Sequence, residues 1–444
     1  MPGSARSLSD IQCIPNLLLT SPSYPENRSD PYLLEQSPSA FFSARVSLIL
    51  YSLHVHVLLL ILGLLLLVPA LPLAVELFTL SLAALFPARK LRTSTGNSLL
   101  AVVIPAHNEQ KLIGPCIRSL QASATEATTI YVVAHNCSDA TAANAADAGA
   151  IVLELNESSG HGKGAALHYG FTHALSQGAD GVLVIDADST VSPNLIPAVI
   201  EALQGGSQAV QCRYIVANPS DSARTRLQSL ALLGMNVLRP RGRSRLALSC
   251  GIFGNGFALA ASTLARVPYT AHSVVEDLEY HLLLLRAGIR VDFLDSAQVL
   301  GEMPDNAAAA QTQRARWEGG RQLMRRRHAL PLLFSSLRHP ALLEPALDLL
   351  SVPLATGVLF TLAALALAIL SHTAWLLICA ASVLSTFVLY VLAAAVLGED
   401  PLANLISLAM APFYLAFKVA SIPATRRAAR KDATWVRTDR NKES

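Results

Sequence analysis

The chain has 444 residues, of which 52% are hydrophobic and only 15% are charged, and its formal net charge is +3. This apolar content exceeds what a soluble globular protein usually carries, so part of the chain is predicted to lie in lipid. The small net charge gives no indication of a nucleic-acid partner.

The N-terminal region divides into an extension and an anchor. Residues 1–50 are rich in Ser and Pro and lack periodicity, which favours a disordered extension. The apolar run within residues 51–92 is about 30 residues long, well beyond the roughly 7 to 15 of a signal peptide. It is therefore predicted to be an uncleaved transmembrane anchor, bent at Pro69 and Pro72 because proline interrupts helical hydrogen bonding.

Residues 97–330 have the mixed composition of a soluble domain. Six cysteines are scattered along the chain without a CxxC pair, which indicates neither a zinc site nor a disulfide framework. Short β-rich runs alternate with helix-length stretches here, so an α/β domain with a largely parallel sheet is predicted. The expected strands are residues 99–104, 129–133, 151–155, 181–185 and 208–214.

A polar motif follows each of the first four expected strands. These motifs are "PAHNE" with Pro105, His107 and Glu109, "AHNCSD" with His135, "NESSGHGKG" with Lys163, and "DADS" with Asp186 and Asp188. Ligands in such sheets bind beyond the carboxyl ends of the strands. One Asp pair could simply cap a helix or start a turn, but four successive strand ends are hard to explain in that way.

Asp186 and Asp188 suit a hard divalent cation, Mg²⁺ or Mn²⁺, which prefers oxygen ligands and leaves positions open for phosphate oxygens. We interpret the two carboxylates as holding this metal against a diphosphate, and Lys163 as a positive charge for that diphosphate. The alternative is that Lys163 is a solvated residue at the start of a helix. The motif is not an NTPase phosphate-binding loop, because Gly164 stands where that loop has Ser or Thr.

Two further motifs lie beyond the expected strands. Glu276 and Asp277 precede an apolar helical run, where they act either as helix caps or, for one of them, as a general base. Gln313, Arg316 and Trp317 have the spacing i, i+3, i+4, which puts them on one helix face and suits a phosphate and a sugar ring. For residues 325–327, all Arg, a basic helix on anionic lipid is favoured.

The C-terminal part is predicted to return to the membrane. An interfacial linker over residues 331–345 leads to helices within 346–423, where 347–370 and 374–397 are each long enough to span. The less apolar segment 401–423 is expected to lie in the interface. Residues 424–444 are then expected to form a basic cytoplasmic tail on the same side as the domain over residues 97–330, because positive flanks stay in the cytoplasm.

The ordered set "VVIPAHNE", "GKGAAL", "DADS", "GNGFAL", "VVEDLE" and "QRARW" resembles the membrane-bound family-two glycosyltransferases, which include cellulose, hyaluronan and poly-N-acetylglucosamine synthases. The resemblance covers about residues 99–330 and implies a GT-A fold, an inverting reaction and a nucleotide-diphosphate sugar donor. It also implies a role for each matching residue: Asp186 and Asp188 as the metal-binding DxD, Asp277 as the base, Lys163 as a donor contact, Asn255 and Gly256 in the acceptor-lining loop, and Gln313, Arg316 and Trp317 as QxxRW.

One position departs from this family pattern. The family usually has an Asp after the second strand that accepts a hydrogen bond from uracil, whereas this chain has His135, with Asp139 four residues later. A neutral imidazole can accept the same bond through one nitrogen. A uridine donor is therefore still expected.

The sequence thus predicts a multi-pass enzyme of the cell inner membrane that moves a sugar from a nucleotide donor to a polysaccharide or lipid-linked acceptor. Glu276 is expected beside the acceptor and diphosphate. Two other functions remain open: a non-catalytic membrane scaffold that keeps the fold, and a transporter. The intact acidic and QxxRW motifs disfavour the scaffold, and the scarcity of ionisable residues in the apolar segments disfavours the transporter.

Overall fold

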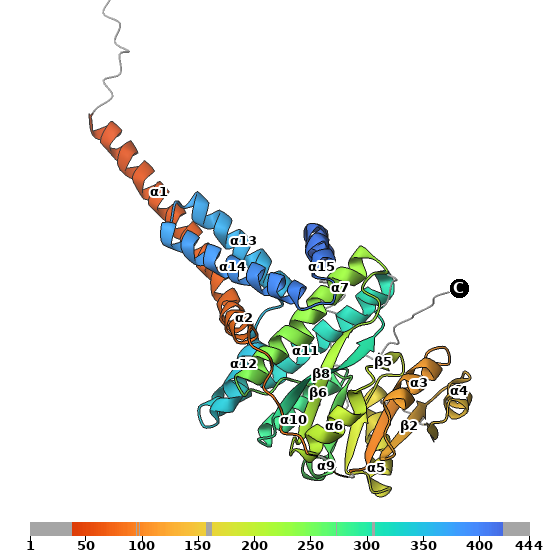
Figure 1. The fold of residues 1–444 in the computed structure, drawn as a ribbon. Helices are drawn as coiled ribbons and strands as arrows, with labels where there is room; N and C mark the ends of the chain where they lie inside the picture. Colours follow the sequence, from red (N-terminus) through yellow and green to blue (C-terminus); the bar gives the residue numbers. More distant parts are fainter. Residues whose placement is uncertain are drawn as a thin grey trace, which may run out of the picture. The chain divides into compact units, whose positions relative to one another are not determined.

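The computed structural model describes residues 38–420, apart from residues 95, 97, 157–161, 272 and 304–306. The chain divides into two compact units, Met1–His56 and Val57–Ser444. Everything described below, except the first part of helix α1, belongs to the second unit. The part that contains the strands, drawn in the lower half of Figure 1, is built around one sheet.

The sheet has eight strands in the order β3-β2-β1-β4-β7-β6-β8-β5. The pairs β1–β2, β1–β4, β2–β3 and β6–β8 are parallel and the others are antiparallel, so the sheet is mixed. All five expected strands are present, and the α/β prediction is confirmed. The strands are β1 (Leu100–Ala106), β2 (Thr128–His135), β3 (Ile151–Leu155), β4 (Gly181–Val184), β5 (Ser189–Val191), β6 (Ala209–Val216), β7 (Phe257–Ala260) and β8 (Val291–Gly301).

Helices cover both faces of the sheet, which is why its central strands are apolar throughout rather than alternating. Leu100, Val102 and Ile104 of β1 belong to the core that includes α3 (Ile113–Ser123) and α6 (Leu195–Gln204). Ala101 and Val103 point the other way, because successive strand residues face opposite sides. They share a core with α5 (Gly162–Ser176), α9 (Ala261–Arg266) and α10 (Glu276–Arg286).

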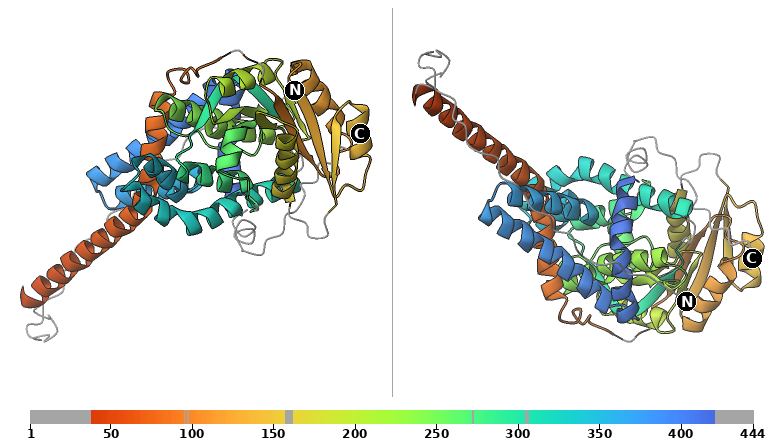
Figure 2. Two further views of the ribbon diagram at one scale, coloured as in Figure 1. Left: turned by 90° about the horizontal axis from the view of Figure 1, so that it is seen from below. Right: turned by 90° about the horizontal axis from the view of Figure 1, so that it is seen from above.

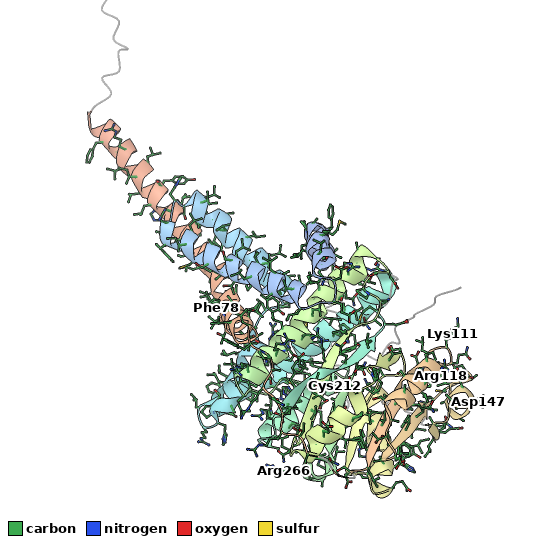
Figure 3. All side chains as sticks on the ribbon, in the orientation of Figure 1. Phe78, Lys111, Arg118, Asp147, Cys212 and Arg266 are labelled. Atoms are coloured by element: carbon green, nitrogen blue, oxygen red, sulfur yellow. The ribbon has the colours of Figure 1, made fainter. Side chains whose placement is uncertain are left out.

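Charged side chains gather at the outer edge of this domain. Figure 3 shows Lys111, Arg118 and Asp147 around α3 and α4 (Thr141–Asp147), whereas Phe78 lies on α2 (Leu71–Ala83). Cys212 lies on β6 and is fully buried. The domain therefore has an ordinary water-facing surface on the side of α3 and α4.

A second set of helices packs on the side of the sheet where β6 and β8 lie. The chain crosses there through α7 (Ala223–Leu233), a π-helical turn η2 (Gly234–Leu238) and α8 (Arg239–Arg245). Helix α8 packs against α2, and η2 packs against α14 (Ala374–Val396). Gly242 permits the first contact, because a Cβ at that position would overlap the backbone of Leu80.

The apolar helices form their own cluster. Helix α1 (Pro38–Leu67) meets α2 through a 3₁₀ turn, η1 (Val68–Ala70), where Pro69 lies. Helices α13 (Leu354–Leu370) and α14 run side by side (Figures 1 and 2) and pack with α2 around buried apolar side chains such as Leu73, Leu77 and Phe387. Among the described residues, Arg45–Ala83 and Ala374–Val396 are long and apolar enough to cross a membrane.

Residues 347–370, predicted to be long enough to span, do not form one continuous helix. The chain forms α12 (Leu343–Leu350) and α13, and the helix pair that includes them bends by 71° at the break. The cause is Pro353, which lacks a backbone N–H and disfavours a helical conformation in the residue before it. The bent pair can count as a third span only if both parts are taken together.

Three boundaries also differ from the prediction. Helix α1 already begins at Pro38, before the expected start of the anchor at residue 51. The expected linker 331–345 is mostly helical, because α11 (Ala307–Ser336) continues through it, followed by η3 (Pro340–Leu342) and α12. Within the expected segment 401–423, the described residues 401–420 form the short pieces α15 (Pro401–Ser407), η4 (Leu408–Met410) and α16 (Ala411–Ala420). None of these is counted among the candidate spans.

Two predictions fall outside the described residues. These are the disorder of residues 1–37 and the cytoplasmic placement of the basic tail 424–444. Both stay predictions.

Candidate active site

The predicted motifs meet in one cavity of about 810 Å³ beyond the carboxyl ends of β1, β2 and β4. This is the position expected for a ligand site in an α/β sheet. The residues singled out from the sequence that line it are Pro105, His107, Glu109, His135, Lys163, Asp186, Asp188, Glu276, Asp277, Gln313, Arg316 and Trp317.

Asn255 and Gly256 do not line this cavity, contrary to their predicted place in an acceptor-lining loop. Asn255 is 1% exposed and supports the wall from behind. Its Oδ1 accepts the backbone N–H of Asp186 at 3.1 Å, and its Nδ2 donates to Ser189 Oγ at 2.8 Å. Gly256 donates its N–H to the Val184 carbonyl at 2.9 Å, because β7 begins at the next residue and draws this segment into the sheet.

Lys163 connects the carboxylate of Asp186 with the loop that contains Gly254. It lies at the start of α5, and its Nζ donates to Asp186 Oδ1 at 2.5 Å and to the carbonyl oxygen of Gly254 at 2.6 Å. Burial alone lowers the pKa of Lys163, but Asp186, Glu276 and Asp277 outweigh it, and the net pKa is raised. The lysine is therefore a fixed ammonium ion at the centre of the cavity.

The two carboxylates after β4 fit a divalent cation that arrives with its substrate. Asp188 accepts a hydrogen bond from Ser189 Oγ at 3.2 Å, and both carboxylates line the cavity. Among the described residues there is no group of three His, Cys, Asp or Glu that could hold a metal alone. Mg²⁺ commonly takes only one or two carboxylates and completes its shell with phosphate oxygens and water, so this donor set suits it.

Glu276 and Asp277 are the first two residues of α10. The N-cap residue is Val275, with no side-chain cap, and Asp277 Oδ1 instead accepts the N–H of Leu278 at 2.7 Å. Burial raises the pKa of Glu276 to about 7, with Lys163 opposing and Asp277 adding to the rise. Burial also raises the pKa of Asp277. Two half-buried carboxyl groups with raised pKa values beside an ammonium ion are the setting expected for proton transfer.

Gly254 lies directly against Asp277. A Cβ at this position would lie 3.2 Å from Asp277 Oδ2, and its φ of +76° belongs to the left-handed region that favours glycine. The "GNG" motif therefore serves two purposes. It presents a carbonyl to Lys163 and leaves room for the carboxylate of Asp277.

The QxxRW residues reach the cavity from α11. Gln313 is 4% exposed, and its Oε1 has no hydrogen-bond partner among the described residues. Burial lowers the pKa of Arg316, while Glu276, Asp186 and Asp277 oppose that shift, so the guanidinium faces the acidic groups. Trp317 is 36% exposed and offers an aromatic surface. Gln313, Arg316 and Trp317 were predicted to share one helix face, and all three line the same cavity.

His107 and His135 line the opposite end, at the tips of β1 and β2. His107 Nδ1 lies 2.8 Å from the carbonyl oxygen of His135. Asp139 makes hydrogen bonds at the start of α4. Its Oδ1 accepts the Thr141 N–H at 3.0 Å and the Thr141 hydroxyl at 2.5 Å. Of these two residues, only His135 lines the cavity.

Tyr214 lines the cavity from β6 and was not singled out by sequence reasoning. Burial and Asp186 raise its pKa, while a hydrogen bond with Asn255 opposes the rise, which places its hydroxyl among the same groups. It lies within the strand run "QCRY", which carries no motif. Only the pairing of β6 with β7 and β8 brings it to the site.

His281 lies one turn after Asp277 on α10 and also lines the cavity. Its Nε2 lies 2.9 Å from Ser249 Oγ, which in turn accepts the backbone N–H of Val291 at 3.0 Å. Burial, together with Arg243, lowers the pKa of His281 to about 4, and Asp348 opposes this shift. The imidazole is thus neutral at pH 7.

This burial predicts an acid-sensitive fold. Between pH 6.5 and 4 the unfolded chain binds a proton at His281 that the folded chain does not, so stability is lost as the pH falls. We expect a loss of about 2 kcal/mol at pH 5 relative to pH 7.5 from this group. His281→Asn should reduce the pH dependence of the thermal unfolding midpoint in detergent, whereas His168→Asn on α5 should not. Equal pH dependence in the wild type and both variants would contradict this assignment.

Comparison with known proteins agrees with this geometry. Residues 97–320 match the family "Glycosyltransferase like family 2". The protein RfbJ of Shigella flexneri is 36% identical over 104 residues, which cover 23% of this chain and 75% of RfbJ. The solved structure of the mannosyltransferase PcManGT from Pyrobaculum calidifontis, in complex with GDP-Man and Mn²⁺, has a TM-score of 0.51 and 18% identity, covering 84% of this chain and 97% of that one.

The fold and the matched region together define a glycosyltransferase with a GT-A-like fold. The chain belongs to glycosyltransferase family 2.

Proposed function

We propose that this protein is an inverting, metal-dependent transferase that moves a sugar from a nucleotide-diphosphate donor to a hydroxyl of a polysaccharide or glycolipid at the membrane. The observation that carries the proposal is the single cavity in which Lys163, the carboxylates after β4 and the carboxylates at the start of α10 come together. Each group matches one requirement of a displacement at an anomeric carbon.

In this mechanism Asp277 takes the proton from the acceptor hydroxyl as that oxygen attacks the anomeric carbon, and the nucleoside diphosphate leaves from the opposite face. No covalent intermediate is required. Lys163 and Arg316 place positive charge where the leaving diphosphate develops negative charge. A cation held by Asp186 and Asp188 would add charge stabilisation to that diphosphate. Trp317 supplies an aromatic face for the acceptor sugar.

Turnover of nucleotide sugars tests the proposal. The purified full chain in detergent should release a nucleoside diphosphate from at least one of UDP-glucose, UDP-N-acetylglucosamine and GDP-mannose in the presence of Mn²⁺. Donors bound tightly but never turned over would instead favour a non-catalytic scaffold.

We infer a uridine donor, with His135 as the acceptor of the hydrogen bond from uracil. His135→Asp should keep or improve the affinity for UDP, because a carboxylate also accepts that bond. Calorimetric titration with UDP and with GDP, each with Mn²⁺, measures the effect. A loss of UDP affinity greater than tenfold would give His135 a different role, and a preference for GDP would overturn the uridine inference.

We further place the catalytic domain on the cytoplasmic face of the cell inner membrane. The run "ARKLR" follows α2, and positive flanks remain on the cytoplasmic side. With α13 and α14 as a hairpin and α15 and α16 in the interface, the tail would return to the same side. The exposed apolar side chains of Leu402, Ile406 and Phe413 support an interfacial position.

A further inference from the structure

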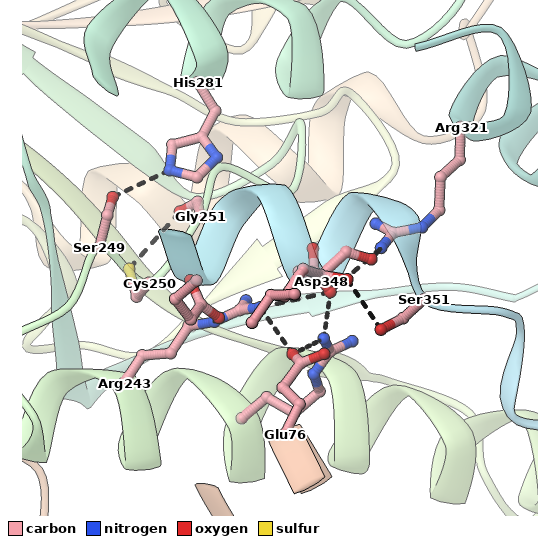
Figure 4. Close-up of polar contacts among 12 residues, drawn as sticks. Glu76, Arg243, Ser249, Cys250, Gly251, His281, Arg321, Asp348 and Ser351 are labelled. Carbon is pink, nitrogen blue, oxygen red and sulfur yellow. Dashed lines mark hydrogen bonds and ion pairs between the residues drawn. The ribbon is translucent and has the colours of Figure 1, made fainter. Parts of the chain in front are cut away.

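A cluster of six charged side chains lies at the end of the cavity nearest the apolar helices. We call it the ion cluster: Glu76 on α2, Arg239 and Arg243 on α8, Arg321 on α11, and Glu344 and Asp348 on α12. Figure 4 shows Glu76, Arg243, Arg321 and Asp348 converging, each from a different helix. The side chains of Glu76, Arg239 and Arg243 are at most 11% exposed, and charged groups are costly to bury, so their presence beside an apolar segment points to a function.

The contacts within the ion cluster are close. Arg239 donates to both Glu76 and Asp348. Arg243 Nε donates to Glu344 Oε1 at 2.6 Å, and its Nη2 lies 3.1 Å from Glu76 Oε1. Arg321 Nη2 lies 3.0 Å from Asp348 Oδ1 and donates to the Asp348 carbonyl at 2.5 Å.

The ion cluster is electrically balanced. It contains three guanidinium groups and three carboxylates, and each guanidinium contacts at least one carboxylate. A phosphate or another anion would need positive charge that is not already compensated. Paired guanidinium and carboxylate groups instead offer donors and acceptors side by side, which suits hydroxyl groups.

Five members of the ion cluster, all except Glu76, line the same cavity as the catalytic carboxylates. Helices α10 and α11 both run from the end of the cavity with the catalytic carboxylates towards the end with the ion cluster. On α10, His281 follows Asp277 by four residues, and on α11, Arg321 follows Trp317 by four residues. Each step is one helical turn, about 6 Å along the axis. That is close to the length of one pyranose unit.

From this geometry we propose that the ion cluster is a subsite for the second sugar of a saccharide acceptor. The inference rests on the proposed function: when the attacking hydroxyl of the terminal sugar lies at Asp277 and its ring lies near Trp317, the next sugar reaches Arg321, Glu344 and Asp348. The acceptor class is therefore a glycan of at least two units rather than a lipid phosphate.

The test compares acceptors of one and two sugars with the full chain in detergent and Mn²⁺. The pairs are glucose and cellobiose, N-acetylglucosamine and chitobiose, and mannose and mannobiose, with undecaprenyl phosphate as the anionic alternative. For at least one pair, kcat/KM for the disaccharide should exceed that for the monosaccharide by about tenfold or more, as two added hydrogen bonds to charged groups imply.

Arg321→Met should reduce this disaccharide advantage to within about twofold of unity, because it keeps the apolar stem and removes the donors. Arg321→Lys, which keeps the charge but loses the planar fork, should give an intermediate value. Arg241→Met is the matched control. Arg241 lies on α8 and pairs with Asp295 at 2.7 Å, but it does not line the cavity, so its loss should preserve the advantage.

Several results would overturn the inference. They are an unchanged advantage in Arg321→Met, an equal loss in Arg241→Met, no saccharide accepted, or transfer to undecaprenyl phosphate alone. A protein that releases nucleoside diphosphate yet shows one of these results loses only the second-sugar subsite. A protein that releases none from any donor loses the proposed function, and the subsite with it.

Discussion

Asp277→Asn should lower the rate of sugar transfer by about 10²–10⁴-fold while donor binding survives, since general-base assistance contributes about that factor. Asparagine keeps the size of the side chain and can still accept the N–H of Leu278, but it cannot take a proton. Steady-state transfer, measured beside equilibrium binding of UDP with Mn²⁺, separates the chemical step from donor binding.

Glu276→Gln is the matched control for this variant. Glu276 is adjacent, lines the same cavity and also has a raised pKa. Neighbouring helix residues point in different directions, so only one of the two carboxylates can face the acceptor hydroxyl. Loss of transfer and binding together in Asp277→Asn would make Asp277 structural. Full activity there, with loss in Glu276→Gln, would move the base to Glu276.

Much of the catalytic domain could be predicted because its signals are local. The apolar runs of β1, β2 and β4 are each followed directly by a polar motif, and parallel strands bring such motifs to one edge. The spacing of Gln313, Arg316 and Trp317 indicates one helix face whatever surrounds the helix. The strand pattern therefore predicts that the cavity lies at this edge of the sheet.

The remaining features depend on contacts between distant segments. Asn255 lies behind the cavity wall because β7 pairs with β4, and no local pattern at residue 255 shows this. Tyr214 reaches the site only through the mixed half of the sheet. The ion cluster joins residues from 76 to 348, and no local sequence pattern shows which of these charges pair with one another.

The broken span at Pro353 has a different explanation. The composition of residues 347–370 is predominantly apolar, and hydrophobicity alone does not reveal the missing backbone N–H of Pro353. Asp348 was a further sign, because a carboxylate in a membrane span needs a partner. Its partners are Arg239, Arg243 and Arg321, and α12 also contributes to the wall of the cavity.

Asp186→Asn and Asp188→Asn should each abolish metal-dependent release of the nucleoside diphosphate. A neutral amide oxygen is a weaker ligand for a hard cation than a carboxylate, and two carboxylates leave no third to compensate. The free energy of unfolding should change by no more than about 1 kcal/mol, since both lie at the edge of an open cavity. EDTA should reproduce the loss in the wild type, and added Mn²⁺ should reverse it.

Asp180→Asn provides the control at the opposite end of β4. Asp180 is exposed, and its Oδ2 accepts the N–H of Leu99 at 2.9 Å, so this variant loses a carboxylate of the same strand away from the cavity. It should retain full metal-dependent activity. Asp186→Asn carries a second consequence, because it also removes the ion pair of Lys163. If Asp188→Asn and EDTA leave activity intact while Asp186→Asn abolishes it, Asp186 acts through Lys163, and the metal assignment is wrong.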